Sequence, residues 1–191
     1  MILGYEPAPN EESPERVSVD APGSHSVSAA YKKDIVAALQ ELKPREGARL
    51  VLFGAEVAEL PEGERRALLS RVGFVPAHGG LISSLNAWEN ISLPLGYHAP
   101  QNLNAALGEV HALLGELGGI DEHFLAKLPE DMTRYELRLA AYVRAVLERP
   151  QLLVVDDLAE GLGPTKRKRV ARFGEVYQAH CPGGTYVQFE E

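Results

Sequence analysis

The sequence has a single cysteine, Cys181, among its 191 residues. One cysteine cannot form an intrachain disulfide, so a disulfide-stabilised secreted protein is not expected and a reducing compartment is the simplest interpretation. No apolar run approaches the roughly 20 residues that a membrane-spanning helix requires. The first residues also lack a basic stretch followed by an apolar core, which argues against a secretory signal. These absences predict a cytoplasmic protein.

Positive charge is also scarce. The chain carries 19 Lys and Arg residues against 27 Asp and Glu residues, which gives a formal net charge of −8. A negative average field opposes nonspecific binding of nucleic acid, so no nucleic-acid partner is expected. One basic cluster stands out, formed by Lys166, Arg167, Lys168, Arg169 and Arg172. Such a cluster is typical of a solvated helix face, with an anionic partner as the alternative.

Apolar residues recur with helical and strand periods along most of the chain. Residues 152–155, LLVV, are apolar at every position, as expected for a strand that is covered by helices on both faces. Helical spacing extends over residues 31–42, 104–117 and 135–148, and a further helix starts at Pro164. Strands are predicted at 17–19, 48–54, 72–75 and 185–189. This alternation predicts an α/β domain with a mainly parallel sheet flanked by helices.

Proline and glutamate dominate residues 6–15, which read EPAPNEESPE. Such a segment has little to bury, so we predict a flexible N-terminal arm over residues 1–15 and a folded domain over residues 16–191.

Two neighbouring carboxylates, Asp156 and Asp157, directly follow the buried LLVV strand. In α/β sheets, ligands bind beyond the carboxyl ends of the strands, and carboxylates there are suited to holding a magnesium ion bound to phosphate. A retained divalent-metal site is one interpretation, and capping of neighbouring backbone amides is the other.

Several segments, in the same order, resemble the ATP-binding subunits of ABC transporters, the P-loop ATPases that drive membrane permeases. They are residues 47–54, GARLVLFG, residues 71–98 and residues 128–164. The motif ENISLPL at residues 89–95 is nearest to the subunits of bacterial lipid-trafficking transporters. The resemblance covers about residues 16–191 and implies a P-loop NTPase-like ABC ATPase fold with a small helical subdomain inserted at about 79–135.

The motifs that contact ATP in this family are altered here. A phosphate-binding loop needs G-x-x-x-x-G-K-[ST], because glycines let successive backbone N–H groups point at the phosphates. In an ungapped comparison the lysine position falls on Lys32, but residues 26–34 read SVSAAYKKD and contain no glycine. Ala77 occupies the position of the Q-loop glutamine. In the signature loop, Thr133 keeps a hydroxyl, whereas Arg134 and Tyr135 replace the two glycines.

The acids and the tail are altered as well. Asp156 matches the Walker B aspartate that binds magnesium, and Asp157 stands where a catalytic glutamate is expected. A side chain one methylene shorter withdraws its carboxylate by about 1.5 Å, a displacement that can cost about a hundredfold in rate. Gly163 replaces the D-loop aspartate, and the tail TYVQFEE has no switch histidine. We expect the side chains of Arg134 and Tyr135 to occupy the space where phosphate would approach. Asp34, Arg134 and Glu136 are then three ionisable side chains that crowd the former phosphate surfaces.

This pattern supports two hypotheses. The first is a non-catalytic pseudo-ATPase, a binding, scaffold or regulatory subunit that needs no cofactor and docks on a permease or a second ABC ATPase subunit, peripheral to the inner face of a membrane at most. The alternative is a divergent, slow ATPase in which Lys32 contacts the phosphates of Mg-ATP, Asp156 binds the metal, Asp157 is catalytic and Thr133 contacts a partner's nucleotide. A structural adaptor unrelated to transport is a third possibility.

Residues 79–98 match the region that, in this family, receives a cytoplasmic helix of the permease. Trp88, the only tryptophan, lies near Leu85 and Leu93. Tryptophan is enriched at the energetic centres of interfaces, so these three residues are predicted to bind a partner. The alternative is that Trp88 belongs to the core of the helical subdomain.

Overall fold

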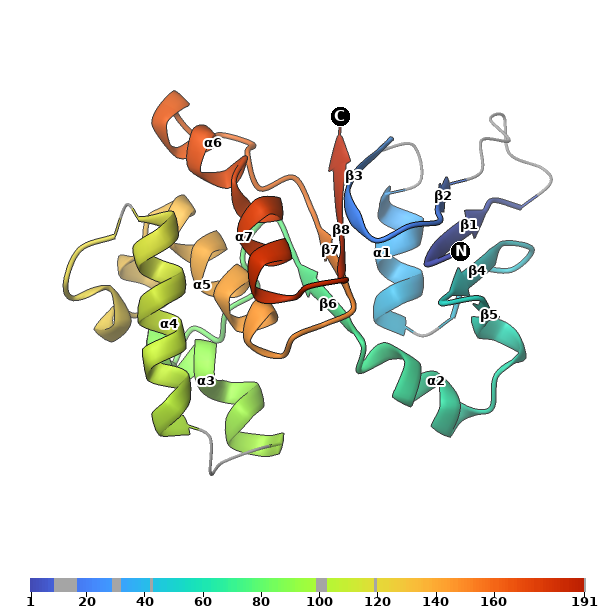
Figure 1. The fold of residues 1–191 in the computed structure, drawn as a ribbon, viewed down its shortest axis with the longest axis horizontal. Coiled ribbons are helices and arrows are strands. Elements are labelled where there is room, and N and C mark those ends of the chain that lie inside the picture. The colour runs from blue at the N-terminus through green and yellow to red at the C-terminus, as the bar shows by residue number, and fades with distance from the viewer. Residues whose placement is uncertain (9–16, 29–31, 42, 99–102, 119, 191) are drawn as a thin grey trace.

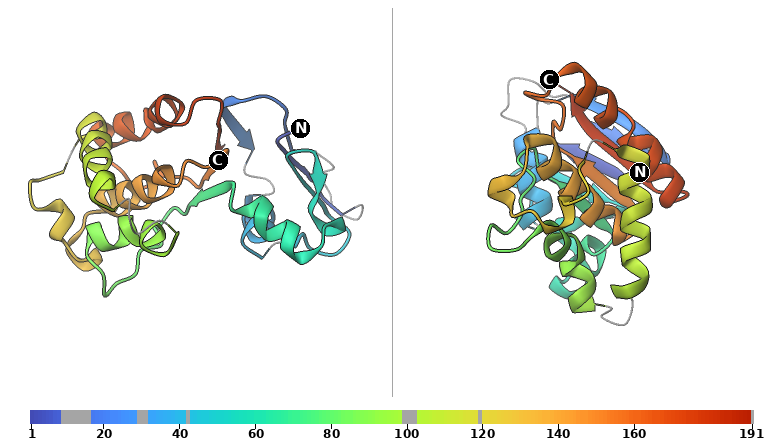
Figure 2. Two further views of the ribbon diagram at one scale, coloured as in Figure 1. Left: turned by 60° about the horizontal axis from the view of Figure 1, so that its bottom comes forward. Right: turned by 90° about the vertical axis from the view of Figure 1, so that its left-hand side faces the viewer.

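Two four-stranded sheets and a cluster of helices make up this computed structural model, which describes residues 1–8, 17–28, 32–41, 43–98, 103–118 and 120–190. The molecule is elongated (Figure 1). An antiparallel sheet with helices α1 and α2 lies at one end, helices α3 and α4 lie at the other, and the parallel sheet runs between them (Figures 1 and 2).

The central sheet is parallel, with strand order β3-β8-β7-β6. Its strands are β3 (Gly23–Ser28), β6 (Val72–Val75), β7 (Leu152–Val155) and β8 (Thr185–Glu190). The sequence prediction of a parallel sheet flanked by helices is confirmed. Because parallel strands share one direction, their carboxyl ends meet at one edge, which is where ligands bind in α/β proteins.

The second sheet is antiparallel, with order β2-β1-β4-β5, and consists of β1 (Leu3–Glu6), β2 (Val17–Val19), β4 (Arg49–Leu52) and β5 (Ala55–Glu56). Strand β1 corrects the predicted N-terminal arm. Leu3 and Tyr5 are fully buried, and the strand pairs with β2 and β4. Residues 9–15 of the predicted arm lie outside the described residues.

The helices agree with the predicted spacing to within a residue or two in most cases. They are α1 (Lys32–Glu41), α2 (Glu62–Leu69), α3 (Ala87–His98), α4 (Leu103–Leu117), α5 (Arg134–Leu147), α6 (Pro164–Val170) and α7 (Phe173–His180), with short 3-10 turns η2 (Val57–Glu59), η4 (Phe124–Ala126) and η5 (Pro129–Asp131). The helix predicted from Pro164 is divided into α6 and α7. Over the described ranges, no helix has the length and apolar character needed to cross a bilayer.

Strand β7 separates two hydrophobic cores. Leu153 and Val155 face one core with α4, α5 and α7, whereas Leu152 and Val154 face the other, together with α1 and the antiparallel sheet. Side chains alternate between the faces of a strand, so a strand buried on both faces has to be apolar at every position, as the sequence predicted.

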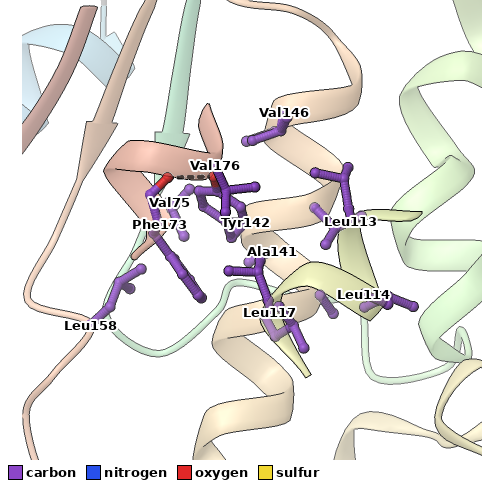
Figure 3. Packing of buried hydrophobic residues seen from close by; sticks show 14 of the residues in the cluster. Val75, Leu113, Leu114, Leu117, Ala141, Tyr142, Val146, Leu158, Phe173 and Val176 are labelled. Carbon is purple, nitrogen blue, oxygen red and sulfur yellow. Dashed lines mark hydrogen bonds between the residues drawn. The ribbon is translucent and has the colours of Figure 1, made fainter. Parts of the chain in front are cut away.

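The helical core is closed by an aromatic pair. The rings of Tyr142 and Phe173 lie 4.1 Å apart between centroids, and the Tyr142 hydroxyl donates to the Phe173 carbonyl at 2.7 Å (Figure 3). The bond ties α5 to the start of α7, so the helices on this face hold a fixed position against the sheet.

Candidate functional site

The carboxyl edge of the parallel sheet brings Lys32 and Asp156 together. Asp156 follows β7 directly, and its backbone N–H donates to the Val75 carbonyl at 2.9 Å, which holds it beside the end of β6. Lys32 is the first residue of α1. Its Nζ lies 2.6 Å from Asp156 Oδ1, and both side chains are largely shielded, at 25% and 18% exposed. Two residues that the sequence singled out separately therefore form an ion pair.

The connection that leads to Lys32 is short. Strand β3 ends at Ser28 and α1 begins at Lys32, so only residues 29–31 join them. The phosphate-binding pattern sets two glycines and the four residues between them ahead of its lysine. Residues 29–31, Ala-Ala-Tyr, lie outside the described residues, but their number and lack of glycine follow from the sequence.

Both aspartates after β7 also bind backbone amides. Asp157 Oδ1 accepts hydrogen bonds from the N–H groups of Ala159 and Glu160 at 3.0 and 3.1 Å, which caps the turn that follows the strand. Asp156 Oδ1 accepts from the Asp157 N–H at 2.8 Å, and Oδ2 accepts from the Ala77 N–H at 3.4 Å. Within the described part of the chain, no group of three or more His, Cys, Asp or Glu side chains is placed to hold a metal ion.

Arg138 of α5 links the loops around this edge. Its Nε donates to the Ala77 carbonyl at 2.6 Å, and its Nη1 donates to the carbonyls of Leu158 and Glu160 at 2.8 and 2.7 Å. The residue is only 6% exposed. Burial lowers the pKa of its guanidinium, and the nearby carboxylates of Asp157 and Glu160 act in the opposite direction. Sequence reasoning did not identify Arg138.

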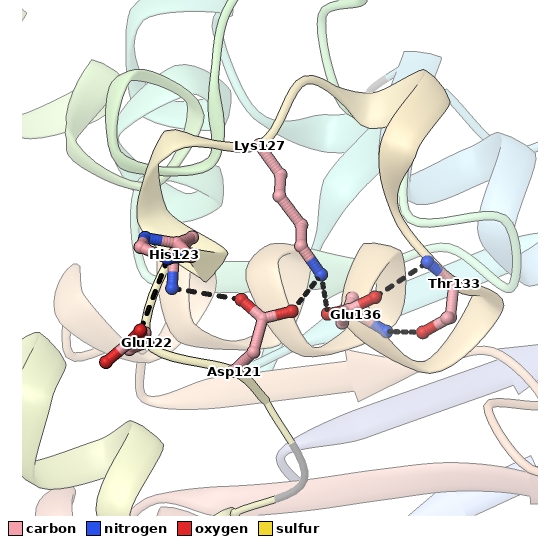
Figure 4. A network of polar contacts seen from close by, with 6 residues as sticks. All are labelled: Asp121, Glu122, His123, Lys127, Thr133 and Glu136. Carbon is pink, nitrogen blue, oxygen red and sulfur yellow. Dashed lines mark hydrogen bonds and ion pairs between the residues drawn. The ribbon is translucent and has the colours of Figure 1, made fainter.

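A capping box stabilises the start of α5, at the position of the signature loop. The Thr133 hydroxyl accepts from the Glu136 N–H at 3.3 Å, and the Glu136 carboxylate accepts from the Thr133 N–H at 2.8 Å (Figure 4). Lys127 joins Glu136 at 2.7 Å and also pairs with Asp121. Burial raises the pKa of Glu136, but its bonds to Lys127 and Thr133 outweigh this effect and lower it.

The expectation that signature-loop side chains block a phosphate surface is wrong for two residues. Tyr135 is 1% exposed and points into the helical core, where its hydroxyl donates to the Gly118 carbonyl at 2.9 Å. Glu136 is 4% exposed and pairs with Lys127 as described. The other acid, Asp34, forms an ion pair with Arg45, with 3.5 Å between Asp34 Oδ1 and Arg45 Nη1.

The basic cluster on α6 is partly used inside the molecule. Lys166 Nζ lies 4.4 Å from the centroid of the Tyr135 ring, as in a cation–π contact. Arg167 donates to the Leu162 carbonyl at 2.8 Å, and Arg172 donates to the Glu116 carbonyl at 3.0 Å. These contacts agree with a structural role for the cluster.

A groove of about 360 Å³ opens on α3 and the start of α4. It is lined by Leu85, Glu89, Ser92, Leu93, Gly96, Tyr97 and Leu103. Tyr97 is 81% exposed. Leu85 and Leu93 therefore lie where a partner could reach them, whereas Trp88 is half-buried and packs against the helical core.

Asn90 holds the rim of this groove. It is fully buried, its Oδ1 accepts from the Ile82 N–H at 2.7 Å, and its Nδ2 donates to the carbonyls of Ile82, Leu85 and Asn86 at 3.0, 2.8 and 3.1 Å. One side chain thus fixes residues 82–86 over the start of α3.

Comparison with protein-family profiles gives no match. Among curated proteins, the chain is similar to the methionine import ATP-binding protein MetN of Xanthomonas campestris pv. campestris (strain 8004), with 28% identity over 140 residues, which is 72% of this chain and 40% of MetN. It is also similar to the ergothioneine transport ATP-binding protein EgtV of Helicobacter pylori (strain G27), with 26% identity over 125 residues, which is 65% of this chain and 58% of EgtV. The chain thus matches less than two thirds of the length of these relatives.

Solved structures that resemble this chain include ABC ATPase cassettes. CbiO1 of Clostridium perfringens, part of the ABC transporter complex CbiONQ, superposes with a TM-score of 0.76 and 16% identity over 100% of this chain and 78% of CbiO1. A dimeric post-hydrolysis structure of the ATP-binding cassette MJ0796, bound to ADP and Pi, superposes with a TM-score of 0.74 and 16% sequence identity. This superposition covers 100% of this chain and 88% of that chain. These superpositions confirm the predicted ABC ATPase fold.

Proposed function

We propose that this chain is a non-catalytic ABC-ATPase-like subunit, which acts as a binding, scaffold or regulatory component of a membrane transport system. The observation that carries the proposal is the connection of three residues, without glycine, between β3 and α1. The similarity to curated ATP-binding transport proteins and the cassette fold support the transport context.

A short connection without glycine is unsuited to a triphosphate. A phosphate nest needs several successive backbone N–H groups that point inward, and glycine supplies the positive-φ conformations that such a nest contains. Lys32 is already paired with Asp156. An incoming Mg-ATP would have to displace that pair, and the six residues ahead of Lys32 offer no glycine to receive its phosphates, so it fits this edge poorly.

The loops around the edge are also held without a ligand. Arg138 joins the segment after β6 to the segment after β7 through three carbonyls. Asp157 is committed to the turn amides of Ala159 and Glu160. We infer that the positions of these loops do not depend on nucleotide, which suits a scaffold better than a motor.

The groove on α3 supports a docking role. Leu85, Leu93 and Tyr97 provide an apolar lining, and Glu89 adds a negative charge. This lining suits an amphipathic helix with an apolar stripe and a basic residue, such as a cytoplasmic helix of a permease. The matched relatives are named for methionine and ergothioneine transport, and the likeness to lipid-trafficking subunits stays a prediction.

The alternative is a slow ATPase that uses Lys32, Asp156 and Asp157. The observation in its favour is that Lys32 and Asp156 meet at the carboxyl edge of the sheet, where an ATPase of this fold would place them.

Calorimetric titration with Mg-ATP separates the two functions. We expect a Kd of about 1 mM or weaker, equivalent to about −4 kcal/mol, because residues 26–31 ahead of Lys32 contain none of the glycines that a phosphate-binding loop uses. Lys32→Ala should leave the signal unchanged, as should the control Lys33→Ala on the exposed face of α1. Micromolar binding that is lost in Lys32→Ala alone, with phosphate release that is lost in Asp157→Asn, would establish the ATPase.

Docking is tested by co-purification with candidate permeases of the same organism. Tyr97→Asp should reduce recovery at least about tenfold, since a charge replaces an exposed anchor in the groove. Leu107→Asp on α4 is the matched control, because Leu107 is 39% exposed and does not line the groove. Equal recovery of both variants would rule the groove out as the docking surface.

A further inference from the structure

A second cavity lies at the opposite end of the parallel sheet, where β7 and β8 begin. Its volume is about 550 Å³, which is within the usual range of small-molecule sites. Four separate parts of the chain line it: Ile2, Phe53, residues 149–151 ahead of β7 and residues 180–185 leading into β8. We call it the basal cavity.

Both non-glycine residues with positive φ in the described part of the chain line the basal cavity. They are Phe53, with φ of 50°, and Arg149, with φ of 51°. Phe53 precedes Gly54 in the two-residue turn between β4 and β5, a position that favours asparagine or glycine. Bulky side chains occupy both positions although glycine would relieve the strain, and such strain concentrates where a ligand is held.

The Phe53 ring is held in place as one wall of the cavity. The guanidinium of Arg71 lies 3.9 Å from the ring centroid. Arg71 is fixed in turn, because its Nε and Nη2 donate to Gln151 Oε1 at 3.0 and 2.6 Å. Phe53 and Gln151 both line the cavity. The contacts through Arg71 therefore hold the Phe53 ring and the Gln151 amide in place without a ligand.

The polar lining of the basal cavity supplies positive charge. Arg149 Nη2 donates to Glu109 Oε1 at 3.1 Å, but its side chain is 65% exposed, and an exposed ion pair of this kind is weak enough to be exchanged for a ligand. His180 Nε2 lies 3.1 Å from Glu116 Oε1. Thr185, at the start of β8, is 1% exposed, and its hydroxyl has no hydrogen-bond partner among the described residues.

We propose that the basal cavity binds a small organic carboxylate with a flat apolar body. The Arg149 guanidinium recognises the carboxylate through its planar pair of N–H donors, and the body rests against Phe53 and the neighbouring prolines. This site is separate from the edge that carries Lys32 and Asp156, because β7 and β8 begin at the cavity and end at that edge.

The site is tested by titrating benzoate into the purified chain and following the backbone amide resonances by NMR. Saturable shifts should concentrate at residues 149–151 and 180–185, and benzyl alcohol, which has the same ring without the charge, should bind at least tenfold more weakly. Equal binding of the alcohol would overturn the role of the anion. Tighter binding of phenyl phosphate than of benzoate would overturn the assignment of a carboxylate.

Three variants separate binding from folding. Arg149→Gly removes the guanidinium and relieves the positive φ, so the thermal midpoint should rise while benzoate affinity falls at least tenfold. Arg149→Lys keeps the charge and the strain but loses the planar fork, so its affinity should fall without a gain in stability. Glu109→Gln removes the negative charge that competes for Arg149 and should bind benzoate at least as tightly as the parent chain. Unchanged affinity in Arg149→Gly, or no shifts in the parent chain up to the solubility of benzoate, would overturn the proposal.

Discussion

Arg138 is a charged side chain in a setting that is otherwise apolar. Residues 139–143 that follow it are fully buried, yet the guanidinium is tolerated because each of its short bonds reaches a backbone carbonyl. A carbonyl that is shielded from water and lacks a donor is costly. The bond to Leu158 is buried and those to Ala77 and Glu160 are partly buried, so one arginine satisfies three groups that would otherwise oppose the folding of these loops.

Replacing Arg138 should therefore destabilise the chain more than its exposure suggests. We expect Arg138→Leu to lower the free energy of unfolding by on the order of 3 kcal/mol, because carbonyls of Ala77, Leu158 and Glu160 lose their donor. Arg134→Leu, one turn earlier and exposed, should change it by less than about 0.5 kcal/mol. Urea unfolding measures both, and equal shifts would contradict the role given to Arg138.

The sequence located some site residues but not their surroundings. Lys32 and Asp156 were both identified, although nothing in their spacing showed that they would pair. Tyr135 was misplaced at a phosphate surface, yet it lies four residues before Leu139, on the same buried helical stripe, and this periodicity was sufficient to place it inside. Arg138 lies four residues before Tyr142 on the inner face, but a charged residue in a buried stripe is not predicted without its partners.

Helix α3 depends on buried side-chain bonds as well as on its own backbone. Pro94 lies inside the helix, where it has no N–H to donate. At the other end, Asn90 ties residues 82–86 to the first turn, and Asn86 caps that turn by accepting from the Glu89 N–H at 2.9 Å. The position of Leu85 in the groove follows from this arrangement.

Matched substitutions at the two asparagines test this arrangement. Asn90→Asp should lower the free energy of unfolding by on the order of 3 kcal/mol, because a carboxylate cannot donate to the carbonyls of Ile82, Leu85 and Asn86. Asn86→Asp should be nearly neutral, since its capping role requires only an acceptor. Thermal unfolding distinguishes them, and a stable Asn90→Asp variant would show that other contacts hold the rim.

Elements with a clear apolar pattern were predicted well, and those without one were missed. Strand β7 is apolar throughout, and α4 and α5 have helical stripes. Strand β3 reads GSHSVS, with Val27 its only large apolar residue, and is held in place by parallel pairing with β8. Helix α3 contains Pro94, which obscures its pattern. Pairing between segments that are distant in sequence determines whether such a segment forms a strand or helix, and local periodicity gives no information on that pairing.

Strands β7 and β8 belong to both hydrophobic cores, so the two ends of the molecule share part of their stabilisation. Val154 and Val187 face the core that contains α1, whereas Leu153 and Tyr186 face the helical core. A loss of packing on one face disturbs the backbone that supports the other. We therefore expect the chain to unfold as one cooperative unit.

Val154→Ala tests this coupling. The lost methyl groups should cost about 2 kcal/mol, and the substitution lies in the core that is remote from the helical end. Trp88, the only tryptophan, packs against the other core and reports on that end by fluorescence. The Trp88 transition and the far-UV circular dichroism transition should shift together in urea. A Trp88 midpoint that stays unchanged would show that the two ends unfold independently.

The separation between the end of β3 and the start of α1 has a consequence for how the chain can change over time. A point substitution exchanges a side chain but adds no length to the backbone, so no series of such exchanges within residues 29–31 can enlarge the connection into a loop that surrounds a triphosphate. Only an insertion, or unwinding of the first turn of α1, would lengthen it. Descendants of this chain that diverge by substitution within residues 29–31 alone would therefore keep the same number of residues between Ser28 and Lys32.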